Sequence, residues 1–150
     1  MTTARIVYAS MTGNNEEIAG IVEEAFQDLE IDVETTEISQ ADAADYQKAD
    51  ICVLVTYTYG EGDMPDEAQD FYDDLLEEDL TGKIYGTCGS GDRFYEGHFC
   101  ATVDDFDKAF AQTGATKGAD SVKVDLAAEA DDIANLEAFV QKLVTAATNR

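Results

Sequence analysis

A short segment near the amino terminus combines hydroxyl, glycine and amide residues where a buried strand is predicted to end and a helix to begin. The segment consists of Ser10, Met11, Thr12, Gly13, Asn14 and Asn15. The first residues of a helix have backbone N–H groups without partners and lie at the positive end of the helix dipole, so they can hold a phosphate dianion without a nearby lysine or arginine. Ordinary helix N-caps prefer the same residue types. The segment is therefore a candidate phosphate-binding turn, with a plain N-cap as the alternative.

Two later segments also combine glycines, hydroxyls and aromatic rings where buried strands are predicted to end. They consist of Thr56, Tyr57, Thr58, Tyr59, Gly60, Glu61 and Gly62, and of Gly89, Ser90, Gly91, Asp92 and Tyr95. Aromatic side chains stack well on planar rings, and glycines allow backbone groups to approach a ring edge. Each tyrosine alone is more often a half-buried loop residue. Together, Tyr59 and Tyr95 predict two covers for a planar ligand.

Strands and helices alternate between these segments. Strands are predicted at residues 6–8, 31–38, 51–55, 83–88 and 120–126, and helices within residues 18–29, 68–76, 99–110 and 131–145. The strand at 31–38 alternates polar and apolar residues, which is typical of a strand at the sheet edge, whereas the apolar run at 51–55 is typical of a strand covered on both faces. The helices carry apolar residues at helical spacing, which gives each one a buried face.

Alternating strands and helices specify an α/β fold, a parallel sheet with helices on both faces. We predict a three-layer sandwich whose five-stranded sheet has the order 2-1-3-4-5. In such sheets ligands bind beyond the carboxyl ends of the strands, where the strand order reverses. The three segments follow the first, third and fourth strands, which are neighbours in this order. They are therefore expected to meet at one crevice, which favours the phosphate-binding turn over the plain cap.

The composition is strongly acidic. The chain has 150 residues, the size of one ordinary domain, with 33 acidic and 9 basic residues and a formal net charge of -24. Such a surface repels nucleic-acid phosphates and anionic lipids, so binding to either is disfavoured. A protein with a basic face is the expected partner, and acidity that serves only solubility is the alternative.

The few cysteine and histidine residues disfavour metal sites, disulfides and Ser-His-Asp hydrolysis. Cys52, Cys88 and Cys100 lack a C-x-x-C spacing and are expected to be small buried side chains. His98 is the only histidine, which disfavours histidine-based metal sites and Ser-His-Asp hydrolysis. No apolar run reaches the length of a membrane span, and no signal-type stretch precedes the first strand, so a cytoplasmic protein is expected.

The three segments together resemble the phosphate loop and the two isoalloxazine loops of the flavodoxins. The resemblance covers essentially the whole chain, and the uninterrupted last strand is similar to that of the short-chain branch. It implies a single flavodoxin-like domain over residues 1–150 that binds FMN non-covalently. It also implies an electron carrier rather than an enzyme, passing single electrons at low potential through the semiquinone and hydroquinone states.

The resemblance also implies roles for individual residues. Ser10, Met11, Thr12, Gly13, Asn14 and Asn15 would hold the phosphate, helped by Thr56 or Thr58. Tyr59 and Tyr95 would cover the two ring faces, Asp92 would lie near the pyrimidine edge, and the Gly60 carbonyl would lie near flavin N5. Two departures from the family pattern stand out. Asn15 replaces the usual Thr of the phosphate motif, and one extra residue stands between Tyr95 and Phe99.

The partners implied are basic-faced redox proteins, namely NAD(P)H-dependent flavodoxin reductases and acceptor enzymes, with the chain acting as a monomer. The nearest alternative is an FMN-dependent quinone or nitro reductase of the same fold. A phosphorylated receiver domain would need an acidic pair after the first strand, where Ser10 and Met11 stand. A cation-binding acidic protein would need a D-x-D-x-D-G loop, which the sequence lacks.

Overall fold

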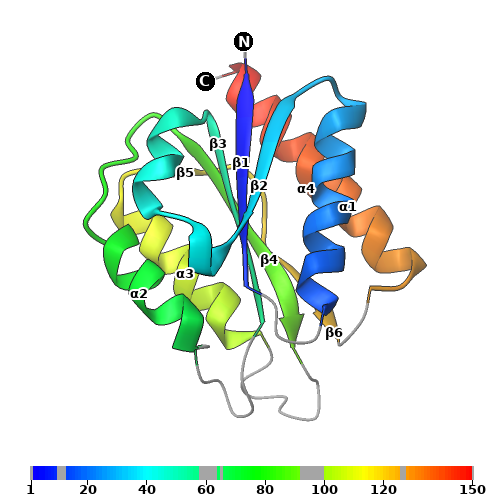
Figure 1. Ribbon diagram of the computed structural model, residues 1–150. Helices are drawn as coiled ribbons and strands as arrows, with labels where there is room; N and C mark the ends of the chain where they lie inside the picture. Colours follow the sequence, from blue (N-terminus) through cyan, green and yellow to red (C-terminus); the bar gives the residue numbers. More distant parts are fainter. Residues whose placement is uncertain are drawn as a thin grey trace.

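The computed structural model describes residues 2–9, 13–57, 64, 66–91, 100–125 and 128–149. Within these ranges strands and helices alternate along the chain (Figure 1). The elements are β1 (Thr3–Tyr8), α1 (Asn14–Asp28), β2 (Asp32–Glu37), the 3-10 helices η1 (Ile38–Gln40) and η2 (Ala43–Lys48), β3 (Ile51–Tyr57), α2 (Asp66–Leu75), β4 (Ile84–Gly91), α3 (Ala101–Gln112), β5 (Thr116–Lys117), β6 (Val122–Asp125) and α4 (Ala130–Asn149).

All described strand pairs are parallel, and the sheet has the order β2-β1-β3-β4-β5, with β6 also paired to β4. This confirms the predicted order 2-1-3-4-5 and places β2 at the edge. The fifth position is divided between two short strands. Tyr85 of β4 pairs with Lys117 of β5, and Cys88 of β4 pairs with Val122 of β6. The chain therefore advances by five residues from β5 to β6 while β4 advances by three.

The sequence predicted one strand at 120–126, which corresponds to β6, and did not show β5. Thr116 and Lys117 are both exposed and are followed by Gly118, so they have neither the burial pattern nor the length of a typical strand. Leu126, the last residue of the predicted strand, lies outside the described residues.

Strands β3 and β4 are longer than predicted. The sequence assigned Thr56 and Tyr57 to one loop and Gly89, Ser90 and Gly91 to another, but all five residues lie in the sheet. Thr56 is opposite Gly89, and Tyr57 is opposite Ser90. Glycine and hydroxyl residues are typical of turns, so their pattern alone placed the strand ends too early.

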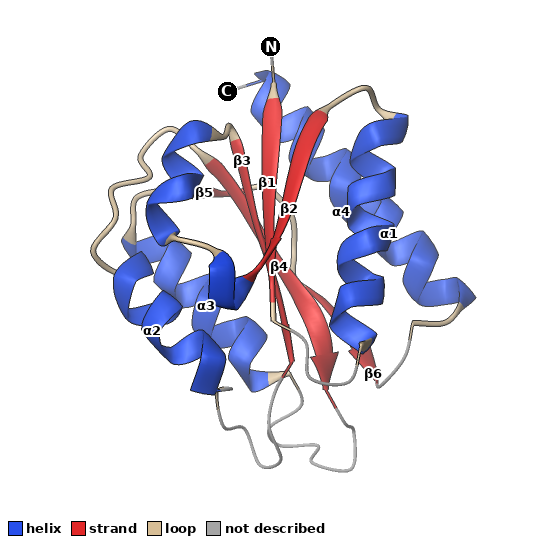
Figure 2. Ribbon diagram, viewed as in Figure 1, coloured by secondary structure: helices blue, strands red, loops and turns tan. Residues whose placement is uncertain are grey.

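Helices α1 and α4 cover one face of the sheet, and α2 and α3 cover the other (Figure 2). The residues of β3 alternate between the two cores: Val53 packs with α1 and α4, whereas Leu54 packs with α2 and α3. This alternation follows from the two-residue repeat of a strand, and it explains the uninterrupted apolar sequence of β3.

The carboxyl ends of β1, β3 and β4 lie at the same edge of the sheet as the beginning of α1, whereas the labelled chain ends lie at the opposite edge (Figure 1). No helix in the described part of the chain is long and apolar enough to cross a membrane.

Candidate functional site

The structure brings the described parts of the three predicted segments together at this edge. Ala9, the residue after β1, donates a backbone hydrogen bond to the carbonyl of Val55 in β3 at 2.9 Å. The backbone N–H of Ser90 at the end of β4 donates to Oδ1 of Asn15 in the first turn of α1 at 3.1 Å. Direct contacts therefore join the end of β1 to β3 and the end of β4 to the beginning of α1, and β3 and β4 are themselves paired.

Only part of the predicted site can be placed. Gly13, Asn14 and Asn15 lie at the beginning of α1, and Thr56, Tyr57, Gly89, Ser90 and Gly91 lie at the ends of β3 and β4. The remaining predicted residues lie outside the described residues, and their roles stay predictions. They are Ser10, Met11, Thr12, Thr58, Tyr59, Gly60, Glu61, Gly62, Asp92 and Tyr95.

Gly13 is the N-cap residue of α1. Its φ of 92° is in the left-handed region, which glycine adopts without strain. A Cβ built at Gly13 would have no atom within 4 Å. A left-handed glycine at this position fits an anion that is held by backbone groups.

Tyr8 is a residue of this edge that the sequence did not single out. It is the last residue of β1, and burial, followed by the carboxylates of Glu16 and Glu37, raises its pKa. Its phenol therefore stays protonated and can donate a hydrogen bond. A strand-ending tyrosine before the candidate turn is the only signal that the sequence offers, and it does not distinguish Tyr8 from an ordinary strand residue.

The end of β3 is held by its own side chains. Thr56 is fully buried, and its hydroxyl donates to the carbonyl of Tyr57 at 3.2 Å. The hydroxyl of Tyr57 donates to Glu67 in the first turn of α2 at 3.2 Å. Both hydroxyls thus have partners within the protein, and the second contact fixes the position of α2 relative to β3.

Gly89 and Gly91 of β4 lie so close to neighbouring backbone atoms that a side chain would not fit. A Cβ on Gly89 would lie 1.7 Å from the carbonyl oxygen of Thr56, and a Cβ on Gly91 would lie 2.9 Å from the backbone nitrogen of Cys100. The sequence interpreted these glycines as backbone groups near a ring edge. The structure gives them a packing role, and contact with a ring stays a prediction.

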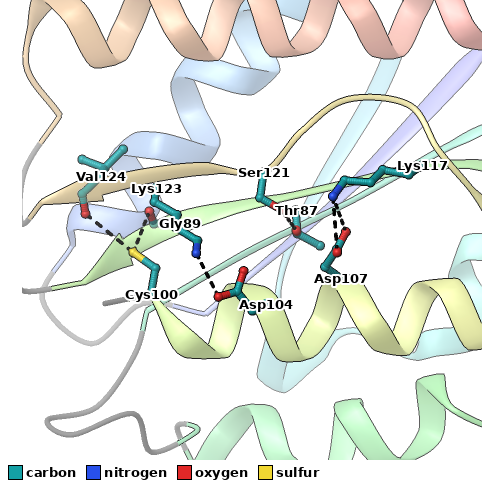
Figure 3. Close-up of polar contacts among 9 residues, drawn as sticks. All are labelled: Thr87, Gly89, Cys100, Asp104, Asp107, Lys117, Ser121, Lys123 and Val124. Carbon is teal, nitrogen blue, oxygen red and sulfur yellow. Dashed lines mark hydrogen bonds and ion pairs between the residues drawn. The ribbon is translucent and has the colours of Figure 1, made fainter. Parts of the chain in front are cut away.

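Cys100 packs where α3 begins, between β4 and β6 (Figure 3). Its Sγ lies 3.8 Å from the carbonyl oxygen of Gly89 and 4.0 Å from that of Val124. Burial raises the pKa of this thiol to about 12, although Lys123 acts in the opposite direction. Cys100 is therefore a protonated packing residue, and like Cys52 and Cys88 it is buried and forms no disulfide, as predicted.

An ion pair on the surface connects β6 to α3 near Cys100 (Figure 3). The Nζ of Lys123 in β6 lies 2.8 Å from Oδ2 of Asp104 in the first turn of α3. Both side chains are partly exposed, so the pair contributes less than about 1 kcal/mol to stability. Its main effect is to connect β6 to α3, which begins beside the carboxyl edge of the sheet.

Comparisons with known proteins agree with this arrangement. The sequence model of the flavodoxin family matches residues 6–139. A probable flavodoxin of Bacillus subtilis strain 168 is 37% identical over 142 residues, which are 94% of this chain and 89% of that protein. The solved structure of a short-chain flavodoxin associated with a non-canonical PDU bacterial microcompartment is 55% identical, with a TM-score of 0.96, and the match covers 98% of this chain and 99% of that chain.

Larger proteins contain a similar segment. The NADPH sulfite reductase flavoprotein alpha-component of Photobacterium profundum is 34% identical over 113 residues, which are 73% of this chain but 18% of that protein. The match thus covers a small part of a reductase.

Proposed function

The chain belongs to the flavodoxin family, and we propose that residues 1–150 form a single domain that holds FMN at the carboxyl edge of its sheet. Flavodoxins bind FMN without a covalent bond, and the chain is accordingly an electron-transfer protein rather than an enzyme. Bound FMN supplies reversible one-electron chemistry, while the protein supplies binding, orientation and charge. The quinone or nitro reductase alternative is not favoured.

The observation that carries the proposed site is the junction of α1, β3 and β4. We assign the phosphate to the turn before α1, formed by Ser10, Met11, Thr12, Gly13 and Asn14. The left-handed backbone of Gly13 at the N-cap of α1, where an added Cβ would meet no atom within 4 Å, supports this assignment. Because the phosphate lies at the positive end of α1, its binding needs no lysine or arginine.

We assign the ring to the two segments that continue β3 and β4. Tyr59 and Tyr95 cover its faces, each stack contributing about 0.5 to 1.5 kcal/mol beyond area burial. Backbone groups around Gly60 and Asp92 lie at the ring edges. The support for this placement is that Tyr57 and Ser90, from which the two segments continue, are paired neighbours in the sheet.

FMN binding is tested most directly by the visible spectrum of the purified protein. We expect yellow protein with flavin absorbance, and we expect apoprotein prepared by removing the flavin to take up one FMN per chain. Tyr59→Ala should weaken FMN binding by about tenfold, because one stacking contact and its buried area are lost. Folded apoprotein that takes up no FMN at micromolar concentration would overturn the proposal.

Flavodoxin-like domains work together with reductases and other redox enzymes. For this chain we propose basic-faced partners, namely NAD(P)H-dependent flavodoxin reductases and acceptor enzymes. We further propose that the chain acts in the cytoplasm and binds these partners as a monomer. The net charge of -24 supports this choice of partner. Helix α2 follows the second predicted segment, and its exposed acids, Asp66, Asp70, Asp73 and Asp74, form an acidic face beside the proposed ring.

The acidic face of α2 should steer association. We expect Asp70→Lys combined with Asp74→Lys to lower the rate of association with a basic flavodoxin reductase by about tenfold at low salt, with a smaller difference at high salt. Stopped-flow electron transfer across a salt series measures this rate. Glu24→Lys combined with Glu137→Lys, on exposed positions of α1 and α4, changes the net charge equally and serves as the control. An equal loss in both double variants would contradict a specific role for α2.

A further inference from the structure

Asn15 is an amide side chain that lies inside the protein although it belongs to the candidate phosphate motif. It is 2% exposed. Buried polar groups need hydrogen-bond partners, and Oδ1 of Asn15 accepts the backbone N–H of Ser90 at 3.1 Å. The side chain is therefore used for a contact between α1 and β4.

The end of β4 is held from three directions. On one side Gly89 packs against the Thr56 carbonyl of β3, and on the other Gly91 packs against Cys100 at the start of α3. Between them, Ser90 donates to Asn15. The contact from Asn15 is the one that comes from the first turn of α1, where the phosphate is assigned.

This contact joins residues that are 75 positions apart in the sequence. Local folding of α1 or of β4 does not set the distance between their ends, whereas a direct buried hydrogen bond does. A ligand with a phosphate at one end and a flat ring at the other must match that distance. Binding geometry held in advance lowers the free energy needed to order the site around a ligand.

We propose that Asn15 is a positioning residue that fixes the end of β4 relative to the beginning of α1, where the phosphate is assigned. The inference rests on the proposed function. It differs from the role that the family resemblance implies for residue 15, in which the side chain contacts the phosphate itself.

Comparison of FMN with riboflavin, which lacks the phosphate, separates the two roles. If Asn15 acts through Ser90, Asn15→Ala lowers the affinities of the apoprotein for FMN and for riboflavin by the same factor, about tenfold, because a buried N–H loses its acceptor. If Asn15 contacts the phosphate, Asn15→Ala weakens FMN alone and leaves riboflavin unchanged. That second result would overturn the inference.

Asn15→Asp is the matched variant, because it keeps an oxygen where Oδ1 accepts the Ser90 N–H and because a carboxylate is favourable in the first turn of a helix. It should restore riboflavin binding to near the wild-type affinity while FMN binding stays weak, since the new charge repels the phosphate. Failure of Asn15→Asp to restore riboflavin binding would count against the inference even if Asn15→Ala did not fold.

Amide hydrogen exchange in the apoprotein gives a readout that needs no flavin. The Ser90 amide should exchange faster in Asn15→Ala than in the wild type, while amides of the β1 and β2 pair keep their protection. Unchanged exchange at Ser90 would contradict the coupling. Wild-type apoprotein that binds neither flavin would instead overturn the proposed function, and the inference with it.

Discussion

Gly89→Ala is expected to destabilise the protein by more than about 3 kcal/mol, because a new methyl group would overlap the neighbouring strand. The added Cβ would lie 1.7 Å from the carbonyl oxygen of Thr56, 2.8 Å from its carbonyl carbon and 3.0 Å from its nitrogen. These are backbone atoms in the middle of the sheet, so they cannot move aside as the end of a flexible side chain can. The substitution would have to separate β3 from β4.

Gly89 is paired on both sides, with Thr56 of β3 and with Lys123 of β6, so separating the strands there would disrupt the middle of the sheet. Urea unfolding followed by circular dichroism should therefore show a much lower midpoint, or no folded protein at all. The remaining folded fraction should bind FMN weakly, because Ser90 is the next residue and its contact with Asn15 depends on the same backbone position.

Gly20→Ala is the matched control for this substitution. Gly20 lies inside α1, and a Cβ there would have no atom within 4 Å. Alanine is the better helix former, so Gly20→Ala should be neutral or stabilise the protein by up to about 1 kcal/mol. Gly91→Ala should fall between the two, because its closest contacts are 2.9 Å and 3.0 Å to Cys100. Equal urea midpoints for Gly89→Ala and the wild type would contradict the packing role of Gly89.

Gly89 also illustrates which features the sequence could reveal. Alternating apolar strands and helices specified a parallel sheet, and the predicted order 2-1-3-4-5 then indicated which segments meet at one edge, because parallel strands share their carboxyl ends. The end of β4 was placed too early, since glycine usually signals a turn. Only the structure shows that the carbonyl of Thr56 occupies the space of the missing side chain.

The contact between Asn15 and Ser90, and strand β5, were missed for related reasons. The chemistry of an amide is the same whether it faces a ligand or the backbone of a distant strand, so the sequence could not predict the contact with Ser90. Strand β5 has only two residues, both exposed, and its pairing with Ile84 and Tyr85 is a tertiary contact that leaves no local pattern. Long-range contacts between short segments are thus the part of the structure that residue types did not determine.

Alkaline pH is expected to unfold the protein through buried groups that must stay protonated. Four such groups, Tyr46, Tyr85, Cys88 and Cys100, are at most 2% exposed. Burial raises the pKa of Tyr46 well above its ordinary value, where its hydroxyl donates to the Val53 carbonyl at 2.7 Å. Burial raises the pKa of Tyr85 and of Cys100 to about 12, and it raises that of Cys88 as well.

The sign of the effect follows from proton binding. A group whose pKa is raised in the folded protein holds a proton that the unfolded chain releases, so its contribution to stability is complete below the unfolded pKa. The contribution then decreases as the pH rises from the unfolded pKa, about 8.5 for cysteine and 10 for tyrosine, to the folded pKa. Each group in this window lowers the unfolding free energy by about 1.4 kcal/mol per pH unit. The two thiols together then remove about 5 kcal/mol between pH 9 and 11, a large part of the stability of an ordinary domain.

Urea midpoints measured from pH 8 to 11.5 should therefore be constant at first and then fall steeply. Tyr46→Phe keeps the ring in its cluster with Phe71 and Phe110 and removes one ionisable group. It should lower stability at pH 8 by about 1 kcal/mol, because the Val53 carbonyl loses its donor, and it should flatten the decline above pH 10. Cys88→Ala should flatten the decline from lower pH, because cysteine begins to ionise before tyrosine in the unfolded chain. Alkaline slopes in both variants that match the wild type would show that other groups control the transition.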